Sequence, residues 1–385
     1  MVSLQPVIAN QFTEQFREIL KAEKSASVKA FREKAFRFFN ENGFPTVRNE
    51  DWKYTNSSKL AGENWKVEVI SSEGSRLDQR LEGLLNKFNL ERNGFTALNA
   101  AFAEIVCVTI PKEMRVVEPI TFEFSALDGS AIFPHILVIA ESGSKATIVE
   151  SYAGEARNFT NSAIQILVED NANLTHYRVQ KESAEAFHVG TTEVSLGRAS
   201  LYNATTINIG AQLSRHDIDV KFTAEGGEAF VDGLYMLNES QHSDTHSIID
   251  HTVPNCVSHQ NYKGVLNDRS RGVFNGKVFV RENASGTDAK QSNKNLLLSN
   301  DARVDTKPQL EIFNDDVKCA HGATVGQLEE EEVFYLLSRG LNPELSRNLL
   351  TYGFAEEIIN KIGIKSIKKE LDEAVLNRLN TNLEA

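Results

Sequence analysis

The sequence predicts a mainly β protein, in which a solenoid of stacked strands, or β-helix, lies between helical N-terminal and C-terminal regions. Three observations predict this fold class. Apolar residues recur at helical spacing at both ends of the chain, but this periodicity is absent between about residues 102 and 318. Short β-rich runs separated by Gly, Asn and Asp fill that middle part. A weak internal repeat of 26 to 27 residues runs through it, and such periods are typical of solenoids.

Residues 1–60 are predicted to form the N-terminal helical region, and residues 61–101 a linking α/β segment. Gly43 and Pro45 are expected to end the second of two helices. Apolar stripes of this kind normally face a core, so we interpret the phenylalanines in them as packing residues. The stripes consist of Phe12, Phe16, Ile19 and Leu20, followed by Val28, Phe31, Ala35, Phe38 and Phe39.

Residues 102–318 are predicted to form the β-helix core. The repeat has a small residue, any residue and then an apolar residue. It begins at Ala146, Ala172 and Ala199, with a later copy at Ala302. Because each turn of a solenoid stacks on the previous one, a single core can extend through the whole region. A pair of β-sandwiches is the alternative that this pattern leaves open. Strand-like runs occupy residues 105–108, 136–139, 164–168 and 278–280.

Residues 319–385 are predicted to form a C-terminal helical domain that caps the solenoid. The first helix is expected over residues 327–338, where four consecutive glutamates suit the positive end of a helix dipole. Asn342 and Pro343 are residue types favoured at the N-cap and first position of the next helix, and Gly353 is expected to end it. Further helices are expected over residues 355–362 and 366–383. A cap is useful because a terminal turn otherwise exposes free strand edges.

The composition narrows the classes of function. The 385 residues include 41 Lys and Arg against 53 Asp and Glu, a net charge of −12. Nucleic acid is not expected as a partner, because its binders present a basic face. No membrane association is expected either, since no apolar stretch approaches the ~20 residues of a spanning helix. The three cysteines do not suggest a disulfide framework, and the N-terminus lacks a secretory pattern, so we expect a cytoplasmic protein.

One group of potential metal ligands is the His242–His259 stretch. Two histidines four residues apart on a strand are separated by about 13 Å, too far to share one metal. A site would need ligands from neighbouring turns, and polar residues on a solvated face are the simpler interpretation. The stretch holds His242, His246, His251, Cys256 and His259.

The second group is Cys319 and His321. On a strand, residues two apart face the same side with Cα atoms about 6.6 Å apart. Thiolate and imidazole are both good ligands for iron or zinc, although a lone Cys-x-His pair is a weak signal. The sequence has no CxxC motif, no GxSxG motif and no Gly-rich phosphate-binding loop.

The wider context of Cys319 and His321 resembles the SufB and SufD family of iron–sulfur cluster assembly proteins. Four segments carry the resemblance, and they extend from the N-terminal region to the C-terminal helices. They are Gly43-Phe44-Pro45 with residues 50–55 (EDWKYT), residues 289–298 (AKQSNKNLLL), residues 318–326 (KCAHGATVG) and residues 334–340 (FYLLSRG).

Two departures favour the SufD type of this family. SufB-type proteins have a glutamate after the histidine of the KCAH segment, whereas this sequence has Gly322. They also have a cysteine about thirty residues upstream, whereas this sequence has none between Cys256 and Cys319. These departures argue against cluster binding by this chain alone.

The resemblance implies a right-handed parallel β-helix and a scaffold role rather than catalysis. SufD-type proteins pair with SufB through the β-helix, and each subunit holds a SufC ATPase through its C-terminal helices. The ATPase activity is therefore expected from SufC, and no cofactor is expected on the isolated chain. In the complex, iron or a nascent iron–sulfur cluster is expected at the SufB–SufD interface, with His321 as a ligand and Cys319 as a weaker candidate. A homodimer of the isolated chain is left open.

Two other classes of function are considered. A carbohydrate-active enzyme could use a groove on a β-helix, but the acidic residues Asp217, Asp219, Asp244 and Asp250 are scattered. A stand-alone metal-binding module could use the His242–His259 stretch, and stoichiometric metal on the isolated chain would favour it.

Overall fold

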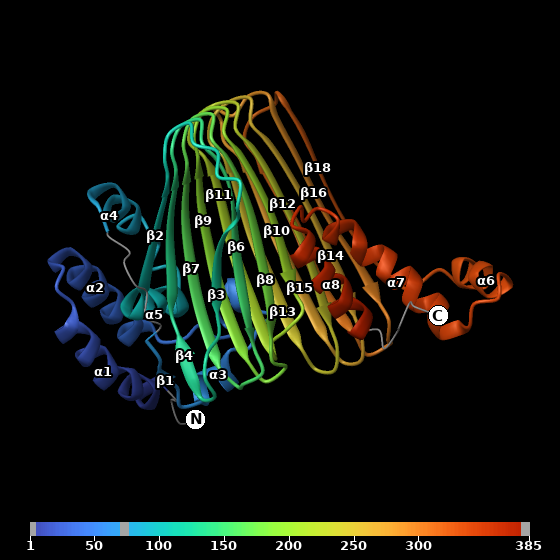
Figure 1. Cartoon of the computed structure of the whole chain (residues 1–385), viewed down its shortest axis with the longest axis horizontal. Helices are drawn as coiled ribbons and strands as arrows, with labels where there is room; N and C mark the ends of the chain where they lie inside the picture. Colours follow the sequence, from blue (N-terminus) through green and yellow to red (C-terminus); the bar gives the residue numbers. More distant parts are fainter. Residues whose placement is uncertain (1–4, 70–76, 379–385) are drawn as a thin grey trace.

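The fold is the parallel solenoid that the sequence predicts, seen in a computed structural model that describes residues 5–69 and 77–378. Two long sheets face each other along the solenoid axis (Figure 1). Sheet A has ten strands and sheet B has eight, and the paired strands of both sheets are parallel throughout. Over most of the solenoid, each turn contributes one strand to each sheet in alternation. The parallel pairing excludes the alternative of two β-sandwiches, whose sheets are antiparallel.

Sheet A consists of β1 (Lys66–Val67), β2 (Glu104–Ile110), β4 (Ser130–Ile132), β5 (Pro134–Ala140), β7 (Phe159–Val168), β9 (Phe187–Leu196), β11 (Leu213–Phe222), β13 (His242–His251), β15 (Arg271–Val280) and β17 (Arg303–Ile312). Sheet B consists of β3 (Ile120–Phe124), β6 (Lys145–Gly154), β8 (Asn173–Glu182), β10 (Leu201–Asn208), β12 (Glu228–Leu237), β14 (Val257–Leu266), β16 (Thr287–Leu297) and β18 (Val317–Gly326). The helices are α1 (Gln5–Ala22), α2 (Ala26–Asn42), η1 (Glu50–Trp52), α3 (Ser58–Gly62), α4 (Gln79–Leu85), α5 (Gly94–Phe102), α6 (Glu330–Ser338), α7 (Pro343–Ile359) and α8 (Lys365–Arg378).

The strand register corrects the repeat that the sequence predicts. Ala146 pairs with Leu174, and Leu174 pairs with Tyr202, so these turns are 28 residues long. The predicted copies at Ala172 and Ala199 instead lie in the turns before β8 and β10, where Ala199 has a φ of 47°. The copy at Ala302 precedes β17, which belongs to the opposite sheet. The period was nearly right but the register was wrong, because small residues recur both in the tight turns and on the strands.

The interior of the solenoid combines apolar packing with paired polar groups. Alternate side chains of each strand point inward, as the pleat requires. Most of them belong to one apolar cluster that runs through both sheets. Buried histidines pair with buried carboxylates among them: His176 Nε2 lies 2.6 Å from Glu150 Oε1, and His188 Nδ1 lies 2.7 Å from Glu182 Oε2. These hydrogen bonds compensate the cost of burying the charged groups.

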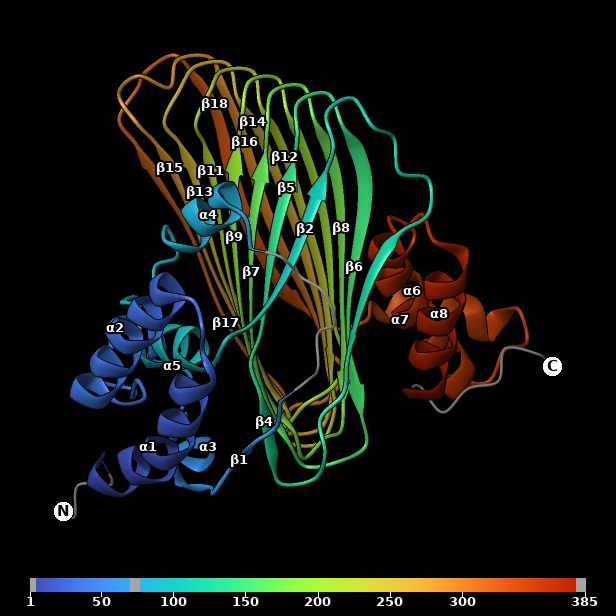
Figure 2. The same cartoon turned by 60° about the vertical axis from the view of Figure 1, so that its left-hand side comes forward.

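The N-terminal helices cover the outer face of sheet A (Figure 2). The side chain of Ser25 accepts a hydrogen bond from the Val28 N–H at the start of α2, and Gly43, with a φ of 64°, follows its end as predicted. The predicted phenylalanine stripe is confirmed as packing, because it joins aromatic residues of sheet A in one core. Its members include Phe12, Phe16, Phe31, Phe39, Phe159 and Phe187.

The C-terminal helices α7 and α8 pack on the outer face of sheet B, on the side opposite the N-terminal helices (Figure 2). Ile358 and Ile359 of α7, with Leu371 of α8, are buried against apolar residues of β6 to β14. Lys263 of β14 is buried beneath α7 and donates hydrogen bonds to Glu357 and to the Phe354 carbonyl. By contrast, α6 projects from the body of the molecule (Figure 1) and buries none of its residues.

Three expectations about the C-terminal region are corrected or limited. Gly353 does not end a helix, because α7 continues through it to Ile359. The apolar contacts of α7 outweigh the cost of about 1 kcal/mol for a helical glycine. The predicted N-cap Asn342 is confirmed by its hydrogen bond from the Leu345 N–H, at 2.8 Å. Residues 319–326, assigned to the helical domain, belong to β18. The predicted extension of α8 to residue 383 lies outside the described residues.

None of the helices within residues 5–69 and 77–378 is long and apolar enough to cross a membrane. The division of the chain into separate domains stays a prediction.

Candidate partner interface and metal ligands

The solenoid ends in an open turn formed by β17 and β18. In the described part of the chain, β17 pairs only with β15, and β18 pairs only with β16. Residues 320–326 of β18 are exposed. A strand edge with free N–H and C=O groups is a template for pairing with another chain. This end of the solenoid is therefore suited to strand-to-strand association.

The two free edges differ because of Pro308, in the middle of β17. The N–H groups of Arg303 and Phe313 donate to carbonyls at the β15 side, so odd-numbered residues of β17 face β15. The nitrogen of Pro308 therefore faces the open edge, where proline is tolerated because no ladder hydrogen bond is lost. An added strand would find no donor at that position of β17. The edge of β18, which contains no proline, offers an uninterrupted series of donors.

Cys319 and His321 lie on β18 and face the solenoid interior. Their register partners on β16 are Ala289 and Gln291, both of which are buried inside the solenoid. Cys319 is half-buried against the apolar core, and this burial raises the pKa of its thiol. A raised pKa disfavours the thiolate that would bind a metal. His321 is exposed, because no further turn covers the open end.

Cys319 and His321 do not form a complete metal site by themselves. Across residues 5–69 and 77–378, no group of three or more His, Cys, Asp or Glu side chains is arranged to hold a metal ion. Iron and zinc usually take four or more ligands, so a metal at His321 would need ligands from another molecule. The exposed position on a free edge allows another molecule to approach.

The histidines of the His242–His259 stretch point in different directions and do not converge. His242 and His246 lie on the outer face of sheet A, where His242 contacts Thr55 Oγ1 at 2.8 Å and His246 contacts Asp244 Oδ1 at 3.1 Å. His251 points into the solenoid and stacks on Phe222. Because the stretch turns from one sheet to the other, its side chains are distributed over three surfaces. This arrangement does not favour the stand-alone metal module.

The acidic residues considered for a carbohydrate-active enzyme are engaged in ion pairs. Asp217 and Asp244 lie 2.8 and 2.7 Å from the guanidinium of Arg215, and all three side chains are 1% exposed. Burial raises the pKa of Asp244, whereas the positive charge of Arg215 lowers it. The resulting pKa of Asp244 lies below its ordinary value. Asp219 pairs with Arg92 at 2.6 Å. These carboxylates hold the structure together and do not line an open groove for a substrate.

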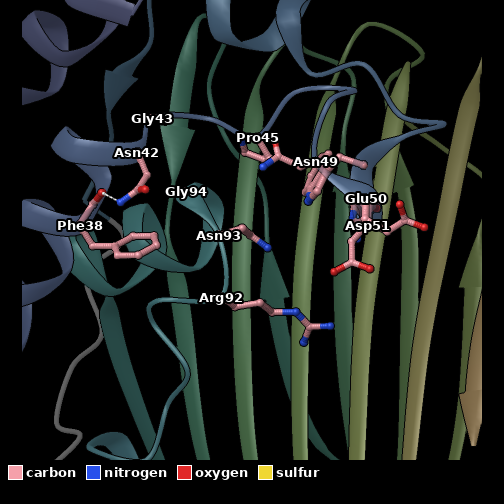
Figure 3. Close-up of a pocket in the computed structure, with 12 residues that line it drawn as sticks. Phe38, Asn42, Gly43, Pro45, Asn49, Glu50, Asp51, Arg92, Asn93 and Gly94 are labelled. Carbon is pink, nitrogen blue, oxygen red and sulfur yellow. Dashed lines mark hydrogen bonds between the residues drawn. The ribbon is translucent and has the colours of Figure 1, made fainter.

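This ion-pair cluster borders a pocket of about 360 Å³ between the N-terminal region and sheet A (Figure 3). Arg92 and Asp51 reach the pocket from two different segments. Arg215 of β11 also lines it. Asn42 closes one side by donating a hydrogen bond to the Phe38 carbonyl at 2.9 Å. This cluster could not be predicted from the sequence, because no spacing pattern connects Arg215 with residues near position 51.

A second surface is formed by α6, which exposes apolar side chains beside acidic ones. Phe334 is 71% exposed and Tyr335 is 55% exposed, and Leu337 is exposed beside them. Glu330, Glu331 and Glu332 occupy the first turn of the same helix. An exposed apolar patch with a charged rim is typical of a protein-binding surface.

Comparisons with known proteins identify the family. A family described as SUF system FeS cluster assembly, SufBD core domain, matches residues 122–354, which include most of the solenoid, the open end and α6. The SufBD protein N-terminal region matches residues 8–79.

Individual relatives carry names from the same system. An iron–sulfur cluster assembly SufBD family protein of Synechocystis is 38% identical over 311 residues, which cover 76% of this chain and 69% of the relative. The SufD protein of Escherichia coli is 34% identical over 252 residues, or 65% of this chain and 59% of that protein. The SufD protein of Bacillus subtilis is 27% identical over 290 residues, covering 73% of this chain and 66% of the relative. With a matching core that spans most of the solenoid, the chain belongs to the SufBD family of the SUF system for iron–sulfur cluster assembly.

Proposed function

We propose that this protein is a non-catalytic scaffold subunit of SufD type, which works in a complex with a SufB-type partner and a SufC-type ATPase. The observation that carries the proposal is the position of His321, an exposed histidine on the free-edge strand β18 at the open end of the solenoid. Family membership places the chain in iron–sulfur cluster assembly. The free thiols of Cys107, Cys256 and Cys319 are compatible with work in a reducing cytoplasm.

The SufB-type partner is proposed to add its own solenoid end to the free edges. β18 is the better edge for this pairing, since Pro308 interrupts the series of donors on β17. A second copy of this chain could use the same edges when no partner is present, which would give a homodimer.

At this junction His321 is proposed to bind iron or a nascent cluster, which is the cargo of the assembly. Cys319 is the weaker candidate, because it is half-buried and burial disfavours its thiolate. The remaining ligands would come from the partner, since no group of three or more potential ligands within residues 5–69 and 77–378 is arranged to hold a metal ion. Imidazole binds iron when it is neutral and can leave on protonation, which suits a cluster that must later be transferred.

The ATPase is proposed to dock on the C-terminal helices. The exposed apolar and acidic side chains of α6 support this placement, as does its projection away from the solenoid. An ATPase surface with an apolar groove and basic rim would complement it. The chain itself has no phosphate-binding Gly-rich loop, so we expect no ATP hydrolysis by the isolated protein.

Co-expression with the SufB-type and SufC-type proteins of the same genome tests this proposal. A tag on this chain should recover both partners in fixed stoichiometry, and the complex should yield iron–sulfur cluster when isolated without oxygen. A matched variant, Ala323→Pro, removes a donor from the open edge of β18, because the odd-numbered N–H groups of this strand point away from β16, and it should fail to recover the SufB-type partner. If neither partner is recovered with the unmodified chain, the scaffold assignment is wrong.

A further inference from the structure

A single column of inward-facing side chains leads through sheet B to His321. The register connects His176 of β8 with Ala204, Ala204 with Val231, and Val231 with Gln260. Gln260 then pairs with Gln291, and Gln291 pairs with His321 at the open end. Side chains at register positions on neighbouring parallel strands are about 4.8 Å apart, so consecutive members of the column are in reach of each other. The last three members, Gln260, Gln291 and His321, are all polar.

The amide of Gln291 is oriented by the preceding member of this column. Its Nε2 donates a hydrogen bond to Gln260 Oε1 at 2.7 Å, and the same oxygen accepts from Ser247 Oγ at 3.1 Å. Because the two ends of a planar amide diverge by about 120°, this bond turns the oxygen of Gln291 away from Gln260. The side of the column away from Gln260 is the side of His321.

The oxygen of Gln291 is a buried acceptor that lacks a donor. Gln291 is 3% exposed, and within the described residues its Oε1 has no hydrogen-bond partner. Leaving such a group unpaired costs about 1–3 kcal/mol, so an unpaired buried acceptor beside a functional side chain calls for a partner. Space for this amide is provided by Gly276 on the opposite sheet, where a Cβ atom would lie only 2.3 Å from Gln291 Nε2.

We propose that Gln291 is a positioning residue for His321: its amide oxygen accepts the N–H of one imidazole nitrogen and leaves the other nitrogen free to bind the metal. This inference depends on the proposed role of His321. Metal-binding histidines usually donate their second ring N–H to a carbonyl or carboxylate, which fixes both the tautomer and the orientation of the ring. Gln291 supplies such an oxygen from within the same chain, before any partner arrives.

The hydrogen-bonded side-chain amides of Gln260 and Gln291 form a short ladder, and orienting His321 gives this ladder a function. Ser247 and Gln291 both donate to Gln260 Oε1, so the oxygen of Gln291 can rotate inward only if the amide of Gln260 turns as well and gives up both of these hydrogen bonds. The ladder therefore presents an acceptor, not a donor, to the imidazole. A donor in the same place would compete with the metal for the ring nitrogen that must stay unprotonated.

The first test measures the tautomer of His321 directly. Long-range ¹H–¹⁵N spectra of the full chain with ¹⁵N-labelled histidine report which ring nitrogen carries the proton, and His321→Ala assigns the signal. We expect one dominant tautomer in the unmodified protein and a mixture in Gln291→Leu. Equal tautomer populations in the two proteins, or a mixture already in the unmodified protein, would overturn the inference.

The second test compares cluster yield in the co-expressed complex. Gln291→Leu should lower the yield about 10-fold with both partners still recovered, which is typical for loss of a second-layer hydrogen bond to a metal-binding histidine. Gln291→Glu keeps an acceptor oxygen and should restore most of the yield, since the free Nε2 of Gln260 can turn to donate to it. Gln165→Leu is the matched control, because Gln165 is equally buried but lies on β7, far from the open end.

The outcomes separate this inference from the proposed function. A normal yield from His321→Ala would defeat the role of His321 itself, whatever Gln291 does. A low yield from His321→Ala with a normal yield from Gln291→Leu would defeat only the role of Gln291. Gly276→Ala provides an independent approach, because it displaces the amide of Gln291 without removing it. It should shift the His321 tautomer in the same direction as Gln291→Leu, and an unshifted tautomer would count against the inference.

Discussion

The guanidinium carbon of Arg215 lies 4.0 Å from the centre of the Trp52 ring, and this contact fixes the N-terminal region to the solenoid. Arg215 belongs to β11, whereas Trp52 belongs to the short helix η1. The same guanidinium donates to Asp217, to Asp244 and to the carbonyl of Asp51. A stacked arginine whose partners Asp217, Asp244 and Trp52 are buried makes a contact that lysine could not reproduce.

Replacing Arg215 is expected to destabilise the protein strongly. Arg215→Ala leaves Asp217 and Asp244 buried without their nearest cation, and breaking a buried pair in this way typically costs about 3–5 kcal/mol of unfolding free energy. Urea denaturation followed by circular dichroism measures the loss. The matched control is Arg198→Ala, which breaks the exposed ion pair with Glu225 and should cost less than about 1 kcal/mol. Similar losses for the two variants would contradict the structural role of the buried cluster.

The contribution of Glu193 to stability should fall as the pH rises toward neutrality. Burial and the nearby charge of Asp219 raise the pKa of Glu193 from 4.5 to about 7, against the opposing effects of the Asn89 N–H and Arg92. The folded state therefore holds a proton that the unfolded state releases near pH 4.5. Between pH 4.5 and about pH 7 the unfolded state binds fewer protons than the folded state. The stabilisation that Glu193 contributes is therefore fully present below pH 4.5 and is lost as the pH rises through about 7.

Glu193→Gln removes this titration and tests its sign. Relative to the unmodified protein, the variant should become progressively more stable between pH 5 and pH 8, as measured by urea denaturation at each pH. Glu225→Gln, at an exposed position, serves as the control and should follow the unmodified protein. Parallel pH curves for Glu193→Gln and the unmodified protein would show that the carboxyl titrates equally in both states.

His321→Ala should separate complex assembly from cluster formation. The side chain is exposed, and its proposed hydrogen bond to Gln291 is worth about 0.5–1.5 kcal/mol, so its removal should lower the unfolding free energy only modestly. Both partners should be recovered, whereas the cluster yield per complex should fall about 10-fold or more. Cys319→Ala should have a smaller effect. An unchanged cluster content, measured by iron and sulfide analysis, would leave this chain without an assigned ligand.

The apolar face of α6 should carry much of the affinity for the ATPase. Phe334→Ser and Leu337→Ser should each weaken SufC binding about 10-fold or more in titration calorimetry, which is the range for central apolar contacts. Neither should lower the melting temperature, since α6 buries no residue against the solenoid. Val117→Ser, at a position 87% exposed before β3, is the control for a surface apolar residue. Wild-type affinity in both α6 variants would place the ATPase contact elsewhere.

Several features of the fold could be predicted from the sequence because they depend on local patterns. The stripe from Val28 to Phe39 gives a helix with one buried face, and Asn342 before Pro343 gives an N-cap, whatever lies around them. The strand-rich middle of the chain predicts a solenoid for the same reason. Gly353 does not end its helix as predicted, because the tertiary packing of α7 on sheet B outweighs the weak helix propensity of glycine.

The sequence by itself determined the class of fold, the helical ends, the family resemblance and the two candidate ligands Cys319 and His321. Only the tertiary structure decided which residues meet. The register that aligns Gln260, Gln291 and His321 depends on turn lengths of about thirty residues, and a small error in the repeat misaligns the whole column. Likewise, Arg215 and Trp52 are brought together by the packing of the N-terminal region on sheet A. Burial and long-range pairing are properties of the folded chain, so no local pattern in the sequence encodes them.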